Sequence, residues 1–411
     1  MKLGLFNKIR KALRPGAFRR KVIPYLWYYL GPAALVRLYC RTRRVKRGKI
    51  VFNNFHGCGF GDHQKYIALE LLRRKSPVEI VWLAADPATV VPTLPPNVRV
   101  AGFSPLKAIG EMATAQFWCS NQSLDKFIVW GLFKKPGQCY IQTFHGSLGI
   151  KRVGADIPSD GSVQLWLEML KRDAKMIDYL ISNARWESEF VYARRFFGKG
   201  ETREFGHPRN DVFFGGADSF RAKVRSTLGL SASDRIVLYA PTHRRGGGTS
   251  GYLLEFGQII RACEHRFGGT WKAVVRLHPN MLGIANRFVF DAVAVDATRY
   301  DDIQELLVGS DALISDYSSC MFDFMLSRRP VFVYASDLEQ YERERGLYYP
   351  MSETPFPVAK DEAGLRDNIR GFDDAKYRAG VEEFLKGKGC VEDGHAAERV
   401  VELIERKMKE A

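Results

Sequence analysis

The sequence predicts an α/β protein built from two Rossmann-like domains that face each other across a cleft. Three observations lead to this prediction. The chain has 411 residues, 46% of them hydrophobic, which is more than a single core normally holds. Two runs of the chain alternate short apolar segments with longer amphipathic ones, the pattern of strands and helices in a parallel sheet. Polar groups follow directly after several apolar segments, at the sheet edge where ligands bind.

The first domain is predicted over residues 49–211. An apolar strand from Ile50 to Phe55 leads into a helix from Gln64 to Arg74, and a second strand follows from Ile80 to Ala84. Shorter strands are expected near Phe117, Tyr140, Leu180 and Glu204. Strands alternating with helices in this way favour a parallel sheet.

The second domain is predicted over residues 212–390. Its strands are expected from Ile236 to Ala240, Ala273 to Leu277, Ala312 to Ile314 and Val331 to Tyr334. Residues 211–233 should carry the chain from one domain to the other. A separate helix within residues 391–411, from about Ala396 to Lys409, closes the chain. Two such domains around a cleft form the GT-B architecture.

A polar corner after the strand at 312–314 is the most informative stretch for function. It opens a helix and consists of Asp316, Tyr317, Ser318 and Ser319. Two hydroxyls at a helix start, where unpaired N–H groups carry partial positive charge, suit a diphosphate. Asp323 lies one turn deeper on the same helix face, placed to accept hydrogen bonds from sugar hydroxyls. The alternative is structural: a serine caps the helix and Asp323 is a charge near its start.

Four further segments place a polar group just after a predicted strand. Residues 143–147, 206–211, 239–244 and 276–279 have the sequences Thr-Phe-His-Gly-Ser, Gly-His-Pro-Arg-Asn-Asp, Tyr-Ala-Pro-Thr-His-Arg and Arg-Leu-His-Pro. With the Ser-Asp-Tyr-Ser-Ser corner and the Arg-Gly-Leu-Tyr of 345–348, they resemble the motif set of the CDP-glycerol glycerophosphotransferase family, the teichoic-acid primases and polymerases. The resemblance extends from about Val51 to Tyr349. It implies a GT-B fold and the building of polyol-phosphate chains on bacterial lipid carriers.

His145 is the expected catalytic base. It matches the histidine of the family's His-Gly-Thr motif, and it follows a predicted strand, which leaves its ring exposed at the strand end. A neutral imidazole can take the proton of an attacking hydroxyl at cellular pH. Beside it, Gly146, Ser147 and Lys151 are expected to bind substrate. The match departs at Ser147, where the family has threonine, and at residues 148–149, where Pro-Leu is common.

A second catalytic histidine is expected in the other domain. His278 would donate a hydrogen bond to the diphosphate across the cleft, while Arg276 reaches a phosphate or turns to the other face of the strand. Further candidates for substrate binding are Thr242, Arg209 and Arg244. For the two arginines the alternatives are that they brace an interdomain turn or project into water.

The first predicted strand ends in a glycine-rich loop at residues 56–62, His-Gly-Cys-Gly-Phe-Gly-Asp. Asp62 occupies the position of the third glycine in the dinucleotide-binding fingerprint, so a nicotinamide cofactor is not expected. The resemblance implies that this loop borders the acceptor side of the cleft. The alternative is a tight turn with Asp62 as the N-cap of the next helix.

No cofactor and no metal ion are expected. The sequence has no Asp-x-Asp motif, its histidines lack ligand spacing, and Asp301 and Asp302 stand where they would cap a helix. Positive side chains and helix ends should then fill the role that magnesium has in other phosphoryl-transfer enzymes. The seven cysteines contain no Cys-x-x-Cys pair and predict free thiols in a reducing compartment.

Positive charge is concentrated at the start of the chain. The net charge is +16, and the first 61 residues carry fifteen Lys or Arg and no Asp or Glu. Between two basic blocks lies an uncharged run from Val22 to Val36, with four aromatic residues. It is shorter than the about 20 apolar residues that cross a bilayer. Residues 1–48 are therefore predicted to attach the protein peripherally to an anionic membrane surface, on the cytoplasmic face.

Two alternatives exist for this segment. It could be an amphipathic helix that packs on the protein's own body with a solvated basic rim. Nucleic-acid binding is the other, because basic residues beside aromatics can track phosphates and stack bases. The aromatics form one cluster and no nucleic-acid module signature is present, so no nucleic-acid partner is expected.

These observations predict a transferase that moves glycerol phosphate from CDP-glycerol, or ribitol phosphate from CDP-ribitol, to a hydroxyl of a lipid-linked glycan or polyol-phosphate acceptor, releasing CMP. Residues 49–211 would form the acceptor domain and residues 212–390 the nucleotide-binding domain. A GT-B glycosyltransferase that uses a nucleotide sugar is one alternative. A catalytically silent membrane-binding protein is the other.

Overall fold

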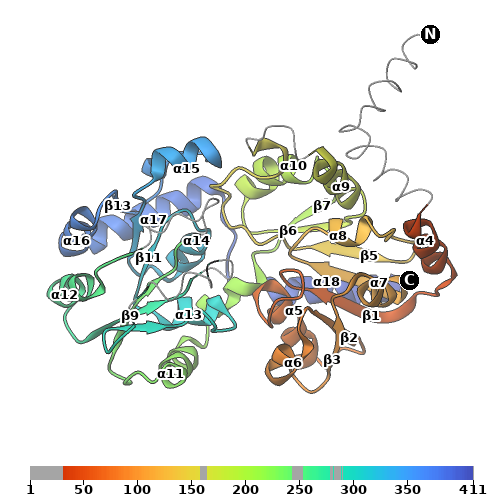
Figure 1. Ribbon diagram of the computed structural model, residues 1–411, viewed down its shortest axis with the longest axis horizontal. Coiled ribbons are helices and arrows are strands. Elements are labelled where there is room, and N and C mark those ends of the chain that lie inside the picture. The colour runs from red at the N-terminus through yellow and green to blue at the C-terminus, as the bar shows by residue number, and fades with distance from the viewer. Residues whose placement is uncertain are drawn as a thin grey trace, which may run out of the picture.

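The computed structural model describes residues 31–157, 164–242, 253–277, 281, 288 and 290–410. These residues form two α/β lobes that lie side by side, each with a parallel sheet at its centre (Figure 1). The predicted fold class is confirmed. The strand alternation and the apolar character of both sheets follow the sequence pattern from which it was predicted.

The N-terminal lobe is built around a sheet of seven described strands in the order β3-β2-β1-β4-β5-β6-β7. The strands are β1 (Lys46–Asn53), β2 (Glu79–Ala84), β3 (Val98–Gly102), β4 (Ala115–Ser120), β5 (Cys139–Gln142), β6 (Tyr179–Ser182) and β7 (Glu201–Glu204), and all pair in parallel. The strand order reverses between β1 and β4. This switch point is where open α/β sheets bind ligands.

Helices cover both faces of this sheet. Those of the described lobe are α4 (Pro32–Thr42), α5 (Asp62–Arg73), α6 (Pro87–Val90), α7 (Pro105–Thr114), α8 (Asp125–Ile128), α9 (Gln164–Ala174) and α10 (Ala193–Arg195). Helices α4, α7, α8 and α9 share a core with one face of the sheet, which includes Val51 and Trp118. Helix α5 packs on the opposite face, against Ile50 and Phe52. Neighbouring residues of β1 thus serve opposite cores, as the two-residue period of a strand requires.

The C-terminal lobe repeats this plan with six described strands in the order β10-β9-β8-β11-β12-β13. They are β8 (Arg235–Tyr239), β9 (Trp271–Val275), β10 (Ala294–Asp296), β11 (Ala312–Ser315), β12 (Val331–Tyr334) and β13 (Val358–Ala359). Around them lie α11 (Ala217–Thr227), α12 (Phe256–Phe267), α13 (Ile303–Gly309), α14 (Cys320–Phe324), α15 (Leu338–Glu344), α16 (Glu362–Arg370) and α17 (Asp374–Lys388). The switch point of this sheet lies between β8 and β11.

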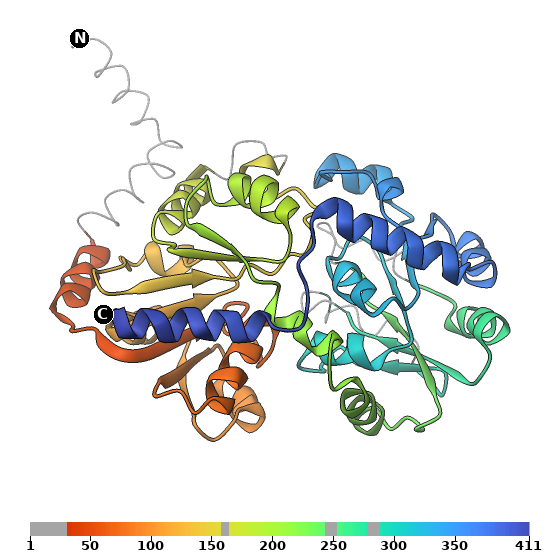
Figure 2. The ribbon, with the colours of Figure 1, turned by 180° about the vertical axis from the view of Figure 1, so that it is seen from behind.

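The chain crosses between the lobes twice. The 3-10 helix η5 (Pro208–Phe213) leads from the first lobe into the second, and α18 (Ala396–Glu410) returns to the first. Figure 2 shows α18 running along the back of the N-terminal lobe, where Val400 and Ile404 join the core under α5. The terminal helix was predicted at this position in the sequence. The structure shows that it packs on the N-terminal lobe.

Several strand boundaries differ from the prediction. Strand β1 begins at Lys46 rather than Ile50, and β3, β10 and β13 were not predicted. Strand β3 has one fully buried residue, and β13 has only two residues, so neither shows a strong apolar pattern. Asp302 was expected to cap a helix, and it does: its carboxylate accepts a hydrogen bond of 3.0 Å from the Gln304 N–H at the start of α13.

Candidate active site

Amide and hydroxyl side chains occupy the switch point of the N-terminal lobe. At the ends of β1 and β4, the Asn53 amide donates to Ser120 Oγ at 2.8 Å. One residue further on, the Asn121 amide donates to Asn54 Oδ1 at 2.9 Å. These buried pairs tie the two loops together. They therefore form a fixed polar surface beside the carboxyl end of the neighbouring strand β5.

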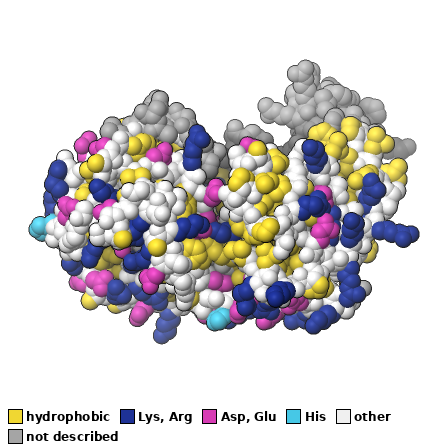
Figure 3. Space-filling model, turned by 90° about the horizontal axis from the view of Figure 1, so that it is seen from below, with side chains coloured by type: hydrophobic (Ala, Val, Ile, Leu, Met, Phe, Trp, Pro, Cys, Tyr) yellow, Lys and Arg dark blue, Asp and Glu magenta, His cyan; other side chains and the backbone are white. Residues whose placement is uncertain are grey.

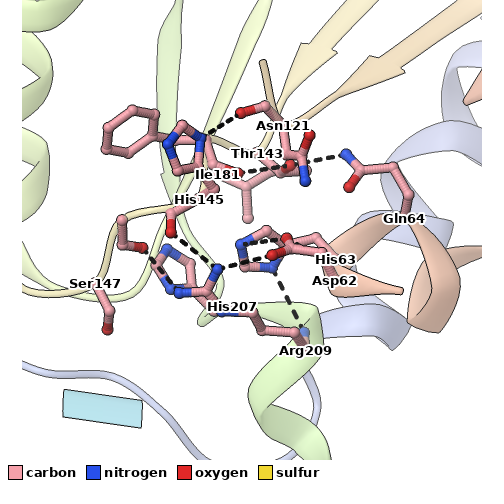
Figure 4. Close-up of polar contacts among 12 residues, drawn as sticks. Asp62, His63, Gln64, Asn121, Thr143, His145, Ser147, Ile181, His207 and Arg209 are labelled. Carbon is pink, nitrogen blue, oxygen red and sulfur yellow. Dashed lines mark hydrogen bonds and ion pairs between the residues drawn. The ribbon is translucent and has the colours of Figure 1, made fainter. Parts of the chain in front are cut away.

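His145 follows β5, and its imidazole is directed toward Asn121 (Figure 4). Its Nδ1 lies 2.8 Å from the carbonyl oxygen of Asn121. A carbonyl only accepts hydrogen bonds, so Nδ1 carries the proton and Nε2 keeps a lone pair. Burial lowers the pKa of His145 to about 4. The imidazole is therefore neutral at pH 7, as a general base requires.

The second switch point holds the predicted serine corner. The Thr242 N–H, after β8, donates to both carboxylate oxygens of Asp316, after β11, at 3.0 Å each. Asp316 is buried, whereas the two serines beyond it are half-buried. Ser319 takes the N-cap position of α14 without a side-chain cap, and Ser318 Oγ accepts a bond of 3.4 Å from the Cys320 N–H. The corner thus lies at a strand end and helix start, as predicted.

Asp323 differs from its predicted role. Its side chain is 2% exposed and faces protein donors rather than an open cleft. Arg209 Nη2 lies 2.9 Å from one oxygen, the Asn210 amide donates to the other at 3.1 Å, and the Ser147 hydroxyl favours the charged form of the carboxylate by lowering its pKa. These contacts engage the carboxylate that was expected to accept bonds from sugar hydroxyls. The pattern of the sequence could not reveal them, because all three partners are more than 100 residues away from Asp323.

Arg209 is also buried, with 4% of its surface exposed. Nη1 lies 3.0 Å from Asp62 Oδ2 and donates to the His145 carbonyl at 3.0 Å, and Nη2 donates to the Gly146 carbonyl at 3.2 Å. Burial opposes the charge, but Asp323 and Asp62 raise the pKa of Arg209, so the guanidinium stays protonated. Of the two predicted roles, these contacts favour bracing between the lobes over phosphate binding.

Ser147 was expected to contact substrate, yet it is 1% exposed. Its hydroxyl accepts a hydrogen bond of 3.0 Å from the Asn183 amide and lowers the pKa of Asp323. Gly146, before it, fits closely against the Phe144 ring, because a Cβ at this position would lie 2.6 Å from a ring carbon. Both residues therefore have contacts with other protein groups that fix the conformation of the loop carrying His145.

Arg276 and Lys151 lie near the contact between the two lobes. Arg276, after β9, donates from Nη1 to the Tyr300 carbonyl and from Nη2 to the Asp301 carbonyl at 3.4 Å. Its guanidinium thus supports the loop before α13. Lys151 forms a backbone bridge with Leu347 of the other lobe. His278 and Arg244 lie outside the described residues.

The glycine-rich loop also departs from the structural alternative. Gly61 is the N-cap of α5, so the expectation that Asp62 caps this helix is wrong. Asp62 is the first helical residue, has a left-handed φ of +55°, and accepts a bond of 2.7 Å from the His63 N–H. Its second oxygen binds Arg209. The glycine-rich loop therefore ends in a carboxylate that pairs with Arg209 between the two lobes.

Two buried histidines were not predicted as site residues. His63 and His207 lie with ring centroids 4.7 Å apart, and His207 Nε2 is 3.0 Å from Glu187. Burial and then the Arg209 charge lower the pKa of His63 well below its ordinary value. Burial opposes protonation of His207, but Glu187 outweighs it and raises the pKa. His63 directly follows the glycine-rich loop and His207 belongs to the segment 206–211, so the sequence motifs offered a signal for both.

A groove of about 530 Å³ runs between the lobes below this junction. It lies between α5, α11 and the loop before α13. Lys65 Nζ crosses it to Asp302 at 2.8 Å and Glu305 at 2.7 Å. On the face drawn in Figure 3, Lys and Arg side chains are interspersed with Asp and Glu. On this face, positive and negative side chains are mixed, whereas the excess positive charge of the sequence lies in the first 61 residues.

Within the described residues, no group of three or more His, Cys, Asp or Glu side chains is arranged to hold a metal ion. Among the helices of the same part of the chain, none combines the length and apolar character that crossing a bilayer requires.

The two lobes, each with a parallel sheet and with polar groups after the carboxyl ends of its strands, have the GT-B architecture. The family described as CDP-Glycerol:Poly(glycerophosphate) glycerophosphotransferase matches residues 35–406. The chain belongs to this family.

Similar proteins have related descriptions. The teichoic acid poly(glycerol phosphate) polymerase of Staphylococcus epidermidis is 28% identical over 390 residues, 92% of this chain and 53% of that protein, so the chain spans about half of this relative. The teichoic acid glycerol-phosphate transferase of Staphylococcus aureus is 27% identical over 88% of this chain and 94% of its own length. A solved histidine-to-asparagine variant of the wall teichoic acid polymerase TagF, with CDPG, is 27% identical, covers 97% of this chain and 99% of that one, and has a TM-score of 0.79.

Proposed function

We propose that this protein transfers glycerol phosphate from CDP-glycerol, or ribitol phosphate from CDP-ribitol, to a hydroxyl of a lipid-linked acceptor and releases CMP. Family membership supports a glycerophosphotransferase, and the similar polymerase solved with CDPG supports the donor. The names of the teichoic-acid relatives support a growing polyol-phosphate chain as the product, and we propose a glycan or polyol phosphate on a lipid carrier as the acceptor. The product is a cell-wall or capsule polymer.

One arrangement carries this proposal: His145 adjoins the same buried contacts as the helix that follows the serine corner. Arg209 bonds the His145 carbonyl and also Asp323, which lies one helical turn after Ser319. A base and a diphosphate-binding corner from opposite lobes therefore share one junction. Phosphoryl transfer needs this geometry, because the protein chiefly aligns the nucleophile with the leaving group and offsets charge.

In the proposed reaction, His145 Nε2 accepts the proton of the acceptor hydroxyl. The hydroxyl oxygen forms a bond to the glycerol-bearing phosphorus, and the bond from this phosphorus to the CMP oxygen breaks. Ser318 and Ser319 bind the diphosphate, and Asp316 with Thr242 holds the corner in shape. His278 donates a hydrogen bond to the same diphosphate, and Lys151 faces the acceptor side.

Membrane attachment of the N-terminal segment completes the proposal. The described part of that segment is α4, which buries Ala33, Val36 and Cys40. Leu35 and Leu38 on its other face are 72% and 59% exposed, and basic residues follow them. Exposed leucines beside Arg and Lys suit the headgroup layer of an anionic bilayer. We place the enzyme on the cytoplasmic face of a bacterial membrane, next to its lipid-linked acceptor.

The test is CMP release from CDP-glycerol in the presence of a short lipid-linked primer. His145→Ala should abolish turnover while the thermal unfolding midpoint stays unchanged. His395→Ala is the matched control, because His395 is exposed and pairs with Glu398 at the start of α18. Turnover of a nucleotide sugar instead of CDP-glycerol would favour a glycosyltransferase. Vesicle binding with no turnover of either donor would favour a non-catalytic membrane protein.

A further inference from the structure

Four buried residues connect the lobes through one carboxylate. We call them the interlobe lock: Asp323 of α14, Arg209 and Asn210 of η5, and Ser147 of the His145 loop. Arg209 Nη2 lies 2.9 Å from the Asp323 carboxylate and the Asn210 amide donates to it at 3.1 Å, while the Ser147 hydroxyl favours its charged form. All four side chains are at most 4% exposed. The carboxylate of one lobe is thus enclosed by donors from the other lobe and from the crossing segment.

The interlobe lock is attached directly to both halves of the proposed site. On one side, Arg209 bonds the backbone carbonyls of His145 and Gly146 at 3.0 and 3.2 Å. On the other side, the Asp323 N–H donates to the Ser319 carbonyl at 3.4 Å. A shift of Asp323 relative to Arg209 would therefore change the separation between the His145 ring and the serine corner.

The loop that carries His145 depends on such outside support. Phe144 and Leu148, on either side, have left-handed φ values of +56° and +49°. Residues other than glycine adopt this conformation at a cost, and they keep it only where surrounding contacts impose it. The bonds from Arg209 and the Asn183 amide to this loop are contacts of that kind. Without these contacts, the loop would relieve the strained φ values and the imidazole of His145 would move with it.

We propose that the interlobe lock sets the distance between the base and the donor site, and that Asp323, Arg209 and Ser147 are positioning residues for phosphoryl transfer. None of the three contacts substrate. This inference rests on the proposed function, because the reaction supplies its kinetic readout.

The first test replaces Asp323 by asparagine. Asp323→Asn keeps the size of the side chain but brings an amide against three donors, so the interlobe contacts should separate. A displacement near 1 Å lowers turnover by about 100-fold, and we expect kcat to fall by this amount while the KM for CDP-glycerol changes by less than about threefold. Asp311→Asn is the control, since Asp311 pairs with Arg225 at 3.1 Å within one lobe. Its kcat should equal that of the wild type.

The second test uses Ser147. Ser147→Ala removes the hydroxyl that binds the Asn183 amide and favours the charged Asp323 carboxylate, and it should lower kcat, whereas Ser147→Thr keeps the hydroxyl and should restore kcat. In the Asp323→Asn background, Ser147→Ala should have no further effect, because the partner of the hydroxyl has already changed. A multiplicative loss in the double variant would overturn the proposal. So would a raised KM with unchanged kcat in either single variant, since that result indicates substrate contact.

Hydrogen exchange separates this proposal from the proposed function. Amide exchange of residues 143–149 should be faster in Asp323→Asn than in Asp311→Asn, whether or not the protein turns over CDP-glycerol. Equal exchange in the two folded variants would overturn the interlobe lock. Faster exchange in a protein that is inactive on CDP-glycerol would support the lock and contradict the proposed reaction alone.

Discussion

The surroundings of His145 determine both its orientation and its charge. The Phe55 and Phe144 rings lie 5.6 and 4.8 Å from the imidazole, centroid to centroid. They give the imidazole two apolar neighbours. Because protonation would place a charge in this poorly solvated site, the neutral form is favoured. A base that stays neutral is ready to accept a proton throughout the pH range of a living cell.

This environment predicts the pH dependence of the reaction. A base must be unprotonated to act, and burial lowers the pKa of His145 to about 4. We expect kcat/KM to stay constant from about pH 7 down to about pH 5 and to fall only as the pH approaches 4. Circular dichroism at each pH should show that the protein remains folded. An acid limb near pH 6.5, the ordinary value for histidine, would contradict the desolvated environment.

At the scale of elements, α4 is attached to the N-terminal lobe through a close backbone contact. Gly131 has a φ of +103°, and a Cβ there would lie 2.4 Å from the Ala33 carbonyl oxygen. Only glycine permits both the conformation and the approach. The opposite face of α4 carries the exposed leucines, so this contact orients the surface that we assign to the membrane.

Gly131→Ala should therefore displace α4. We expect faster proteolysis within residues 31–45 and weaker binding to anionic phospholipid vesicles. Gly137→Ala is a matched control, because Gly137 also has a left-handed φ, of +79°, but has no atom within 4 Å of the added Cβ. Both variants carry the conformational cost of about 1–2 kcal/mol, and only the first adds a clash. Equal proteolysis and vesicle binding would show that α4 is held by other contacts.

The whole molecule is joined by its last helix. Helix α18 follows the C-terminal lobe in sequence but packs in the core of the N-terminal lobe, against α5. Loss of this packing would therefore destabilise both lobes. The interlobe lock and the Lys65 pairs with Asp302 and Glu305 add polar contacts along the same junction. We expect the lobes to unfold together.

Ile404→Ala tests this coupling. Ile404 is fully buried in α18, and removing its side chain should lower the free energy of unfolding by about 2–5 kcal/mol. Urea denaturation, followed by fluorescence and by circular dichroism, should give one transition that shifts to lower urea. Glu402→Ala on the exposed face of the same helix should change the free energy by at most about 1 kcal/mol. A second transition unaffected by Ile404→Ala would mean that the lobes unfold separately.

The sequence by itself determined most of the strands, the class of fold and the places where polar groups would gather. Apolar periodicity is local, and a residue directly after a parallel strand must lie at the carboxyl edge of its sheet, which places His145 and Ser318 at the ligand-binding edges of the two sheets. Tertiary structure alone decided which polar groups face a ligand and which face each other. Arg209 and Asp323 have the same appearance in sequence as substrate-binding residues, but they pair across more than 100 residues. Burial and choice of partner depend on how the lobes pack, and no local pattern encodes that packing.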